Sequence, residues 1–313
     1  MNPLRDPMGR RQFIATGTVL AGGLATRAHG AVAQNAAWAG EVGLTTSSIF
    51  RQMTEGRTNR KFDLLDLPKI MRDELGMKVL DLNSGSFASR DPAQLERFRH
   101  ALDEAGCAVS NVKVNTTVLG VKVQDLSIES ADRATREKAI DLYRDWILAA
   151  SRVGARWVRP FPSDVRPDLA VLVESLTELA DFADGLKMSV ILENAGWMTS
   201  DADAIPRVVE AMGGRIGAQP DTGSWENNAL REAGLVKAFP HAVSCDFKFG
   251  KIGPNGEHTA YDLKHCFDLG WQAGFRGPWV LEHAGENTKE LFRELTWVRD
   301  QLKTWMREAA AKK

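Results

Sequence analysis

The sequence predicts an α/β protein folded as a (β/α)8 TIM barrel. Three observations lead to this class. Short apolar runs alternate with longer amphipathic runs, eight such pairs fit into about 270 residues, and four consecutive apolar runs end in a carboxylate. A doubly wound open sheet is the alternative, but neither G-x-G-x-x-G nor G-x-x-x-x-G-K-[ST] opens a predicted helix.

Eight short apolar segments have the composition and length of buried parallel strands. They are 42–48, 77–83, 107–115, 155–161, 187–194, 215–221, 241–248 and 277–283. Each is followed by a segment with apolar residues at helical spacing. These are 62–76, 91–106, 129–154, 167–186, 200–214, 227–239, 259–275 and 287–310. Asp91 is expected to cap its helix with Pro92 at the first position, and Pro206 is tolerable if its helix begins close to it.

Composition indicates a globular chain with a large core. The 313 residues are 43% hydrophobic and 26% charged. A formal net charge of −1 gives no general attraction to nucleic acid or to an anionic membrane, so neither is expected as a partner. Cys107, Cys245 and Cys266 lack CxxC spacing and are expected to be buried thiols. The oligomeric state stays open, and a homo-oligomer is among the options.

The first 33 residues have the layout of an export signal. Arg10 and Arg11 precede an apolar Gly/Ala-rich stretch that ends in an A-x-A site at Ala33, which resembles a twin-arginine (Tat) signal. An N-terminal membrane anchor is the alternative, but the apolar stretch is shorter than the roughly 20 residues that span a bilayer. We therefore expect a signal peptide over 1–33, one barrel domain over 34–313, and a periplasmic or secreted protein without stable membrane insertion.

Four carboxylates end consecutive predicted strands: Glu193 the fifth, Asp221 the sixth, Asp246 the seventh and Glu282 the eighth. In a (β/α)8 barrel the carboxyl ends of the strands form the active-site face, so these groups are expected to converge there. Four converging carboxylates repel one another unless a cation lies among them, and a divalent metal ion would remove that repulsion. The alternative is four unrelated caps or salt-bridge partners. It applies most to Asp246, because Lys248 shares its face of the strand.

The segments "VILEN", "PDTGSW", "VSCDFKF" and "WVLEHAG", with "DLGWQAGFRGPW" before the last strand, resemble the sugar phosphate isomerase/epimerase group of xylose isomerase-like barrels, also described as AP-endonuclease-family-2-like. The resemblance covers the chain from about residue 42 to the last helix. It implies metal-ligand positions for Glu193, Asp221 and Glu282, with Asp246 standing where family members often have His. An all-oxygen donor set favours Mn²⁺ or Mg²⁺ over Zn²⁺.

The resemblance also implies proton transfer beside a carbonyl, with Glu193 and Glu282 as base and acid. Lys248 is a candidate for stabilising a developing oxyanion. Five further residues are candidates for binding the substrate because they lie at or near strand ends. They are Lys113, Asn115, Arg159, Trp197 and Trp225. Alternative roles are an Arg159–Asp164 ion pair and simple packing of loops by the two tryptophans. His283 is expected on the opposite face of its strand from Glu282.

Export and the lack of a Gly-rich phosphate loop favour a non-phosphorylated sugar or keto-sugar as substrate. The leading hypothesis is a metal-dependent isomerase or epimerase that works through a metal-bound enediolate. A second is a lyase or hydrolase that cleaves 3-keto-glycosides by elimination, and a third is a non-catalytic periplasmic sugar-binding barrel. Endonuclease-like cleavage is disfavoured because basic stretches are missing.

Overall fold

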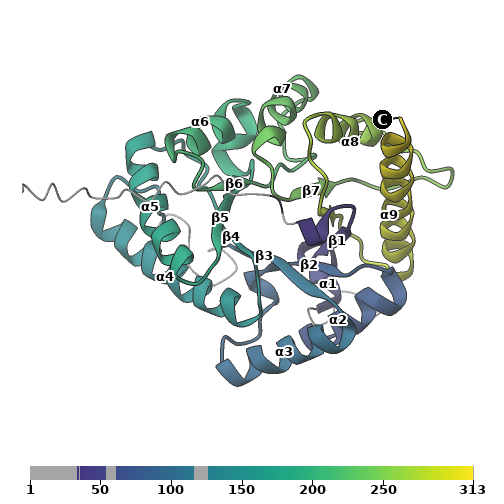
Figure 1. The fold of residues 1–313 in the computed structure, drawn as a ribbon, viewed down its shortest axis with the longest axis horizontal. Coiled ribbons are helices and arrows are strands. Elements are labelled where there is room, and N and C mark those ends of the chain that lie inside the picture. The colour runs from purple at the N-terminus through teal and green to yellow at the C-terminus, as the bar shows by residue number, and fades with distance from the viewer. Residues whose placement is uncertain (1–33, 35, 54–60, 116–125, 313) are drawn as a thin grey trace, which may run out of the picture.

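The computed structural model of the protein describes residues 34, 36–53, 61–115 and 126–312 (Figure 1). The predicted signal peptide lies outside the described residues. Gln34, the first described residue, accepts a hydrogen bond from the backbone N–H of Arg276 at 3.0 Å through its Oε1 atom. No helix within the described ranges is long and apolar enough to cross a membrane.

Eight parallel strands form the centre of the described part of the chain, and each lies within its predicted segment. They are β1 Val42–Thr45, β2 Val79–Asn83, β3 Ala108–Val114, β4 Trp157–Pro160, β5 Ser189–Leu192, β6 Gly217–Ala218, β7 Cys245–Lys248 and β8 Trp279–Glu282. Their order is β6-β5-β4-β3-β2-β1-β8-β7, so β1 pairs with both β2 and β8. Isolated bridges from Ala218 to Ala242 and from Asp221 to Asp246 link the two ends of this order. The sheet is therefore a nearly closed (β/α)8 barrel, as predicted.

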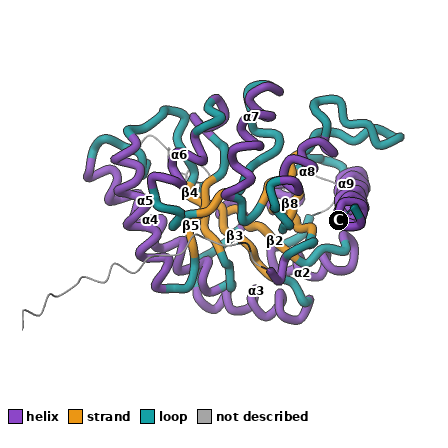
Figure 2. Tube along the Cα trace, turned by 45° about the horizontal axis from the view of Figure 1, so that its top comes forward, coloured by secondary structure: helices purple, strands orange, loops and turns teal. Residues whose placement is uncertain are grey.

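Helices surround the strands (Figures 1 and 2). They are α1 Phe50–Met53, α2 Leu67–Ile70, α3 Pro92–Ala105, α4 Arg133–Arg152, α5 Leu169–Gly185, α6 Ala204–Ala211, α7 Asn228–Ala238, α8 Leu263–Gln272 and α9 Thr288–Ala311. The predicted helix over 62–76 is divided into a 3-10 turn Leu64–Asp66, α2 and a π turn Met71–Leu75. The predicted helices after the other seven strands are present, six with shorter bounds and α9 displaced by one residue.

Local sequence signals fix where several helices begin. Asp91 accepts a hydrogen bond from the N–H of Ala93 at 2.8 Å and Pro92 opens α3, as predicted. Asp132, Asp168 and Asn227 cap α4, α5 and α7 in the same way. Pro206 lies in the first turn of α6, where the missing N–H costs no helical hydrogen bond.

The two ends of the barrel differ in chemistry. Trp38, just before β1, packs edge-on against Trp157 at the start of β4, and Ile191 and Val243 complete this apolar cluster. The opposite, C-terminal end of the barrel collects charged side chains. The barrel is therefore apolar where its strands start and polar where they end, which places the chemistry at the C-terminal end. The three cysteines are free and buried, as predicted.

Candidate active site

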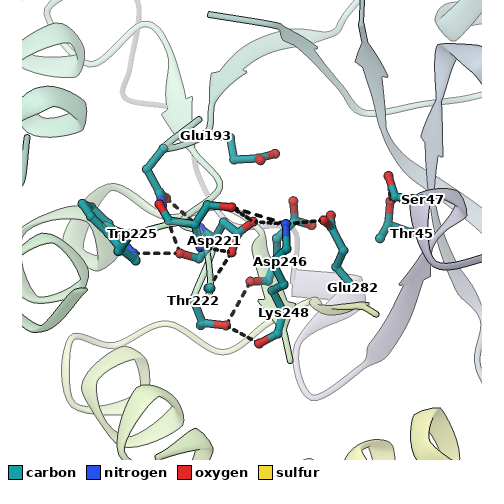
Figure 3. A network of polar contacts seen from close by, with 12 residues as sticks. Thr45, Ser47, Glu193, Asp221, Thr222, Trp225, Asp246, Lys248 and Glu282 are labelled. Carbon is teal, nitrogen blue, oxygen red and sulfur yellow. Dashed lines mark hydrogen bonds and ion pairs between the residues drawn. The ribbon is translucent and has the colours of Figure 1, made fainter. Parts of the chain in front are cut away.

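The four strand-terminal carboxylates lie together at the C-terminal end of the barrel (Figure 3). Asp221 and Asp246 are fully buried and Glu193 is 6% exposed. Each of these three offers a carboxylate oxygen within 4.8 Å of the others, a buried acidic group of the kind that could hold a metal ion. Glu282, the last residue of β8, joins them through two lysines that they share.

Lys113 of β3 reaches across the barrel into the middle of the carboxylates. Its Nζ donates to Oδ2 of Asp246 and lies 3.3 Å from Oε2 of Glu282 and 3.6 Å from Oε2 of Glu193. The side chain is 1% exposed. Burial lowers the pKa of Lys113, but Asp246, Glu193 and Glu282 outweigh burial and hold that pKa well above its ordinary value. Lys113 is therefore a buried, permanently charged ammonium.

Lys248 supplies a second ammonium to the same group. Its Nζ lies 2.7 Å from Oε1 of Glu282 and 3.4 Å from both Oδ2 of Asp221 and Oγ of Ser224 (Figure 3). Asp221 contributes most to raising the pKa of Lys248, burial opposes it, and Glu282 adds to the increase. Lys248 is 38% exposed and Glu282 17% exposed, so solvent reaches the site at this pair.

Arg159 of β4 pairs with Glu193 and not with the alternative partner Asp164. Its Nε lies 3.1 Å from Oε2 of Glu193, and the side chain is 4% exposed. Its Nη1 is buried and has no hydrogen-bond partner among the described residues. Nε makes no hydrogen bond among these residues either, so Arg159 pairs with Glu193 through charge and keeps both donors for oxygens of a bound molecule.

The charged neighbours set different protonation states for the carboxylates. Burial raises the pKa of Glu193, but Arg159 and Lys113 outweigh it and bring this pKa to about 2. Burial also raises the pKa of Glu282, and Lys113 with Lys248 brings it below its ordinary value. For Asp246, burial prevails over Lys113 and raises the pKa well above the ordinary range. The two glutamates are therefore ionised at neutral pH.

A buried polar layer beneath the carboxylates escaped the sequence prediction. Nε2 of Gln219 donates to Oδ2 of Asp81 at 2.6 Å and to Oδ1 of Asp246 at 3.2 Å, while Asn111 donates to Oε1 of Gln219 at 2.9 Å. Burial raises the pKa of Asp81 to about 6, although Lys113 and Gln219 oppose it. Strand alternation is the sequence signal that could have identified two of these residues. Asn111 lies two positions before Lys113, and Gln219 two before Asp221, so each shares the face of that site residue.

The backbone after β6 is held by side chains that orient Asp221. Asn194 donates to the carbonyls of Asp221 and Ser224 at 3.0 and 3.1 Å and accepts from the N–H of Asp221 at 2.8 Å. Trp225 donates through Nε1 to the carbonyl of Asp221 at 2.9 Å. Oδ1 of Asp221 accepts from the N–H groups of Gly223 and Ser224 at 2.6 and 2.9 Å. These bonds fix the Asp221 carboxylate in one orientation.

The remaining predicted binding residues lie beside the site in packed positions. Trp197 donates through Nε1 to Glu129 at 3.1 Å, and Trp225 packs on Gly234 of α7. Each tryptophan is 8% exposed, so little of either ring is open to a sugar. Asn115 follows β3, and its backbone N–H donates to Oγ of Ser84 at 3.0 Å. Their roles in binding stay predictions.

His283 points away from the site, as strand alternation predicts. Its Nε2 lies 2.5 Å from Oε2 of Glu294 on α9, and its ring stacks on Phe249 at 4.7 Å between centroids. This pair attaches β8 to the helix layer. These contacts hold the end of β8 in place, while the side chain of Glu282 faces the barrel axis.

The donor set suits a hard divalent ion in chemistry, because Glu193, Asp221, Asp246 and Glu282 offer carboxylate oxygens. Two lysine ammonium groups already lie among these oxygens. Lys113 contacts three of the four carboxylates. Lys248 contacts Asp221, which is the fourth, and also Glu282. A divalent ion bound to Asp246, Glu193 or Glu282 through the oxygens that contact Lys113 would have to displace its ammonium. Protein cations and a metal ion would thus compete for the same carboxylates, and the predicted metal ligands stay a prediction.

Comparison with known proteins gives the same fold and a family. Over 235 residues the chain is 27% identical to L-ribulose-5-phosphate 3-epimerase UlaE of Escherichia coli (strain K12), covering 66% of this chain and 79% of that protein. D-psicose 3-epimerase from Clostridium cellulolyticum H10, solved with D-tagatose, superposes with a TM-score of 0.66 at 13% identity over 85% of this chain and 99% of that one.

A xylose isomerase-like TIM barrel protein from Mycobacterium smegmatis, solved in complex with magnesium, superposes with a TM-score of 0.58 at 16% identity over 86% of this chain and 97% of that one. The profile of one family, described as xylose isomerase-like TIM barrel, matches residues 73–309. This match spans all but the first of the eight strands and most of the closing helix. The chain therefore belongs to the xylose isomerase-like TIM barrel family.

Proposed function

We propose that the protein is a sugar isomerase or epimerase that moves a proton at the carbon next to a carbonyl group. One observation carries the proposal: Glu193 from β5 and Glu282 from β8 face a shared buried ammonium, that of Lys113, at the C-terminal end of the barrel. The family and the epimerases among its relatives support the same class of reaction.

The proposed proton transfer uses the protein's own groups. One ionised glutamate takes the proton from the carbon, and the electron pair moves toward the carbonyl oxygen to give an enediolate. Lys113 and Lys248 stabilise the negative oxygen, and Nη1 of Arg159 binds a neighbouring hydroxyl. The other glutamate, protonated in its turn, returns a proton to the opposite face or to the adjacent carbon. Glu282 exchanges protons with water because solvent reaches it.

We propose a non-phosphorylated ketose or keto-sugar as substrate. The structure with D-tagatose shows such a sugar for a protein of this fold, whereas the name of UlaE refers to a phosphosugar. The predicted export of the chain favours the non-phosphorylated class, and we propose a periplasmic or secreted location on the basis of residues 1–33.

Dependence on Mn²⁺ or Mg²⁺, which the sequence predicts, stays a prediction outside this proposal. The magnesium complex from Mycobacterium smegmatis supports it at the level of the fold. In this chain the ion would have to displace Lys113 from Asp246, Glu193 and Glu282. No step above therefore passes through a metal ion.

The test is proton exchange with solvent. The full-length mature protein is incubated with a panel of ketoses and 3-keto-glycosides in D2O, and the recovered sugars are analysed by NMR. We expect deuterium at the carbon next to the carbonyl without release of an aglycone. Glu193→Gln and Glu282→Gln should each lower the exchange rate at least about 100-fold, whereas Glu96→Gln on the exposed face of α3 should leave it unchanged.

Two results would contradict the proposal. Release of an aglycone with no epimer would indicate the lyase that the sequence left open. Binding of sugars that survives both glutamine substitutions, with no turnover in the parent protein, would indicate a non-catalytic binding barrel.

A further inference from the structure

We infer that Lys113 and Lys248 replace the divalent ion in this chain, and that the ammonium of Lys113 occupies the position such an ion would need. The inference concerns the site of the proposed function, but its test measures metal binding without substrate. It starts from where the two ammonium groups lie.

Lys113 has the contacts expected of a central cation. Its single Nζ atom contacts oxygens from three strands: Asp246 of β7, Glu282 of β8 at 3.3 Å and Glu193 after β5 at 3.6 Å. The side chain is 1% exposed, so water does not share these contacts to any extent. A lysine buried this deeply is retained in charged form only where carboxylates surround it.

Lys248 completes the set. Its Nζ bridges Asp221 at 3.4 Å and Glu282 at 2.7 Å, so the two lysines together contact all four carboxylates. Glu282 is the shared member, with Oε1 toward Lys248 and Oε2 toward Lys113. Arg159 adds a third positive charge beside Glu193. Four carboxylates thus face three basic groups.

A divalent ion and the Lys113 ammonium need the same oxygens. Mg²⁺ binds carboxylate oxygens at about 2.0–2.1 Å, and an ion at that distance from two of the three partners of Lys113 would be in contact with its Nζ. Other oxygens of the site already accept hydrogen bonds. Oδ1 of Asp221 accepts from the N–H groups of Gly223 and Ser224, Oδ2 of Asp221 from Oγ of Ser224, and Oδ1 of Asp246 from Gln219. The ion and the ammonium therefore exclude each other.

The chemical consequence is a site in which both ammonium groups stay in place whether or not metal ions are present in solution. Proton transfer through an enediolate needs a positive group next to the developing oxyanion, and two fixed ammonium groups meet that need. Because these charges are covalently part of β3 and β7, removal of metals from the solution leaves the electrostatics of the site intact.

The experiment titrates the complete mature protein with Mn²⁺ in the absence of substrate. The EPR signal measures the concentration of free Mn²⁺. The parent is expected to bind no Mn²⁺ in the site at millimolar concentrations. Lys113→Met removes the charge at similar length and is expected to bind one Mn²⁺ per chain, at least about 100-fold more tightly than the parent. Lys113→Arg keeps the charge and should behave as the parent does.

Lys264→Met is the matched control, because Lys264 pairs with Asp268 on the outer face of α8. It should leave the titration unchanged. One tightly bound Mn²⁺ per parent chain, lost in Glu193→Gln, would overturn the inference whatever the variants do. A folded Lys113→Met protein that gains no Mn²⁺ would also overturn it.

The two proposals fail in different ways. A parent that binds Mn²⁺ and catalyses exchange contradicts only the replacement of the ion by lysine. A parent that binds none and leaves every sugar unchanged contradicts only the proposed function.

Discussion

Lys113 shows how one inward-facing side chain sets the electrostatics of a whole site. Without it, buried Asp246 would lose its ion-pair partner, and Glu193 and Glu282 would keep only Arg159 and Lys248. An unpaired buried charge is costly, so the cation is part of what makes the four strand ends compatible. The identity of residue 113 thereby decides whether this barrel needs an external ion.

Arg159 has a related effect on Glu193 alone. With burial opposed by Arg159 and Lys113, the pKa of Glu193 is about 2, and Glu193 is ionised over the whole ordinary pH range. This depressed pKa contributes stability at pH values above the unfolded pKa of a glutamate. The contribution is lost as the pH falls through the folded pKa.

Removal of Arg159 should therefore change a pH profile. In Arg159→Met the pKa of Glu193 should rise by about one unit or more, which moves the acid limb of the exchange rate to higher pH. Loss of Nη1 should also raise KM for the sugar. The measurement is the exchange rate in D2O from pD 2 to 9, with Arg156→Met at the exposed position before β4 as control. An acid limb identical in parent and variant would show that Glu193 is not the base.

At the scale of elements, the ends of the strands and the loops after them position the chemistry. β6 has only two residues, and the loop that follows it is held by Asn194 and Trp225. The ring of Trp225 in turn packs on α7 at Gly234, where an added Cβ would lie 2.0 Å from Cη2 of the ring. The absence of a side chain at residue 234 thus lets α7 support the loop that carries Asp221.

Gly234→Ala should disturb this support. We expect a decrease of about 1–3 kcal/mol in the free energy of unfolding, because the ring of Trp225 has to move. Exchange activity should fall as well, since Trp225 is bonded to the backbone of Asp221. Urea unfolding compares it with Gly185→Ala in α5, where the added Cβ meets nothing within 4 Å and stability should be unchanged or slightly higher. Equal stability of the two variants would show that the close contact between Gly234 and Trp225 does not support the loop that carries Asp221.

At the scale of the whole molecule, the sequence predicted the barrel and the strand-end carboxylates for physical reasons. Strand periodicity and caps such as Asp91 are local, and strand ends converge once the barrel forms. The partners of these carboxylates depend on contacts across the barrel. The Lys113–Asp246 pair joins β3 to β7 over a sequence separation that no local pattern encodes. For the same reason Asp81 and Gln219 escaped prediction, as did the contacts of Lys113 with the carboxylates.

Export is the second property of the whole chain that can be tested. Arg10→Lys combined with Arg11→Lys should keep the full-length protein in the cytoplasm, because the Tat route depends on the arginine pair. Immunoblots of cell fractions should show the parent as a shorter periplasmic form. Arg27→Lys, within the same leader, serves as control. Unchanged export of the double variant would contradict the proposed route.

The most direct test of the account as a whole is exchange by chelator-treated parent protein. After removal of divalent ions, the protein is incubated with ketoses in D2O and the carbon next to the carbonyl is followed by NMR. The account predicts deuterium incorporation at an unchanged rate, because Glu193, Glu282 and the two lysines remain in place. Exchange that disappears with the chelator and returns with Mn²⁺ would contradict it, as would the absence of exchange with every ketose.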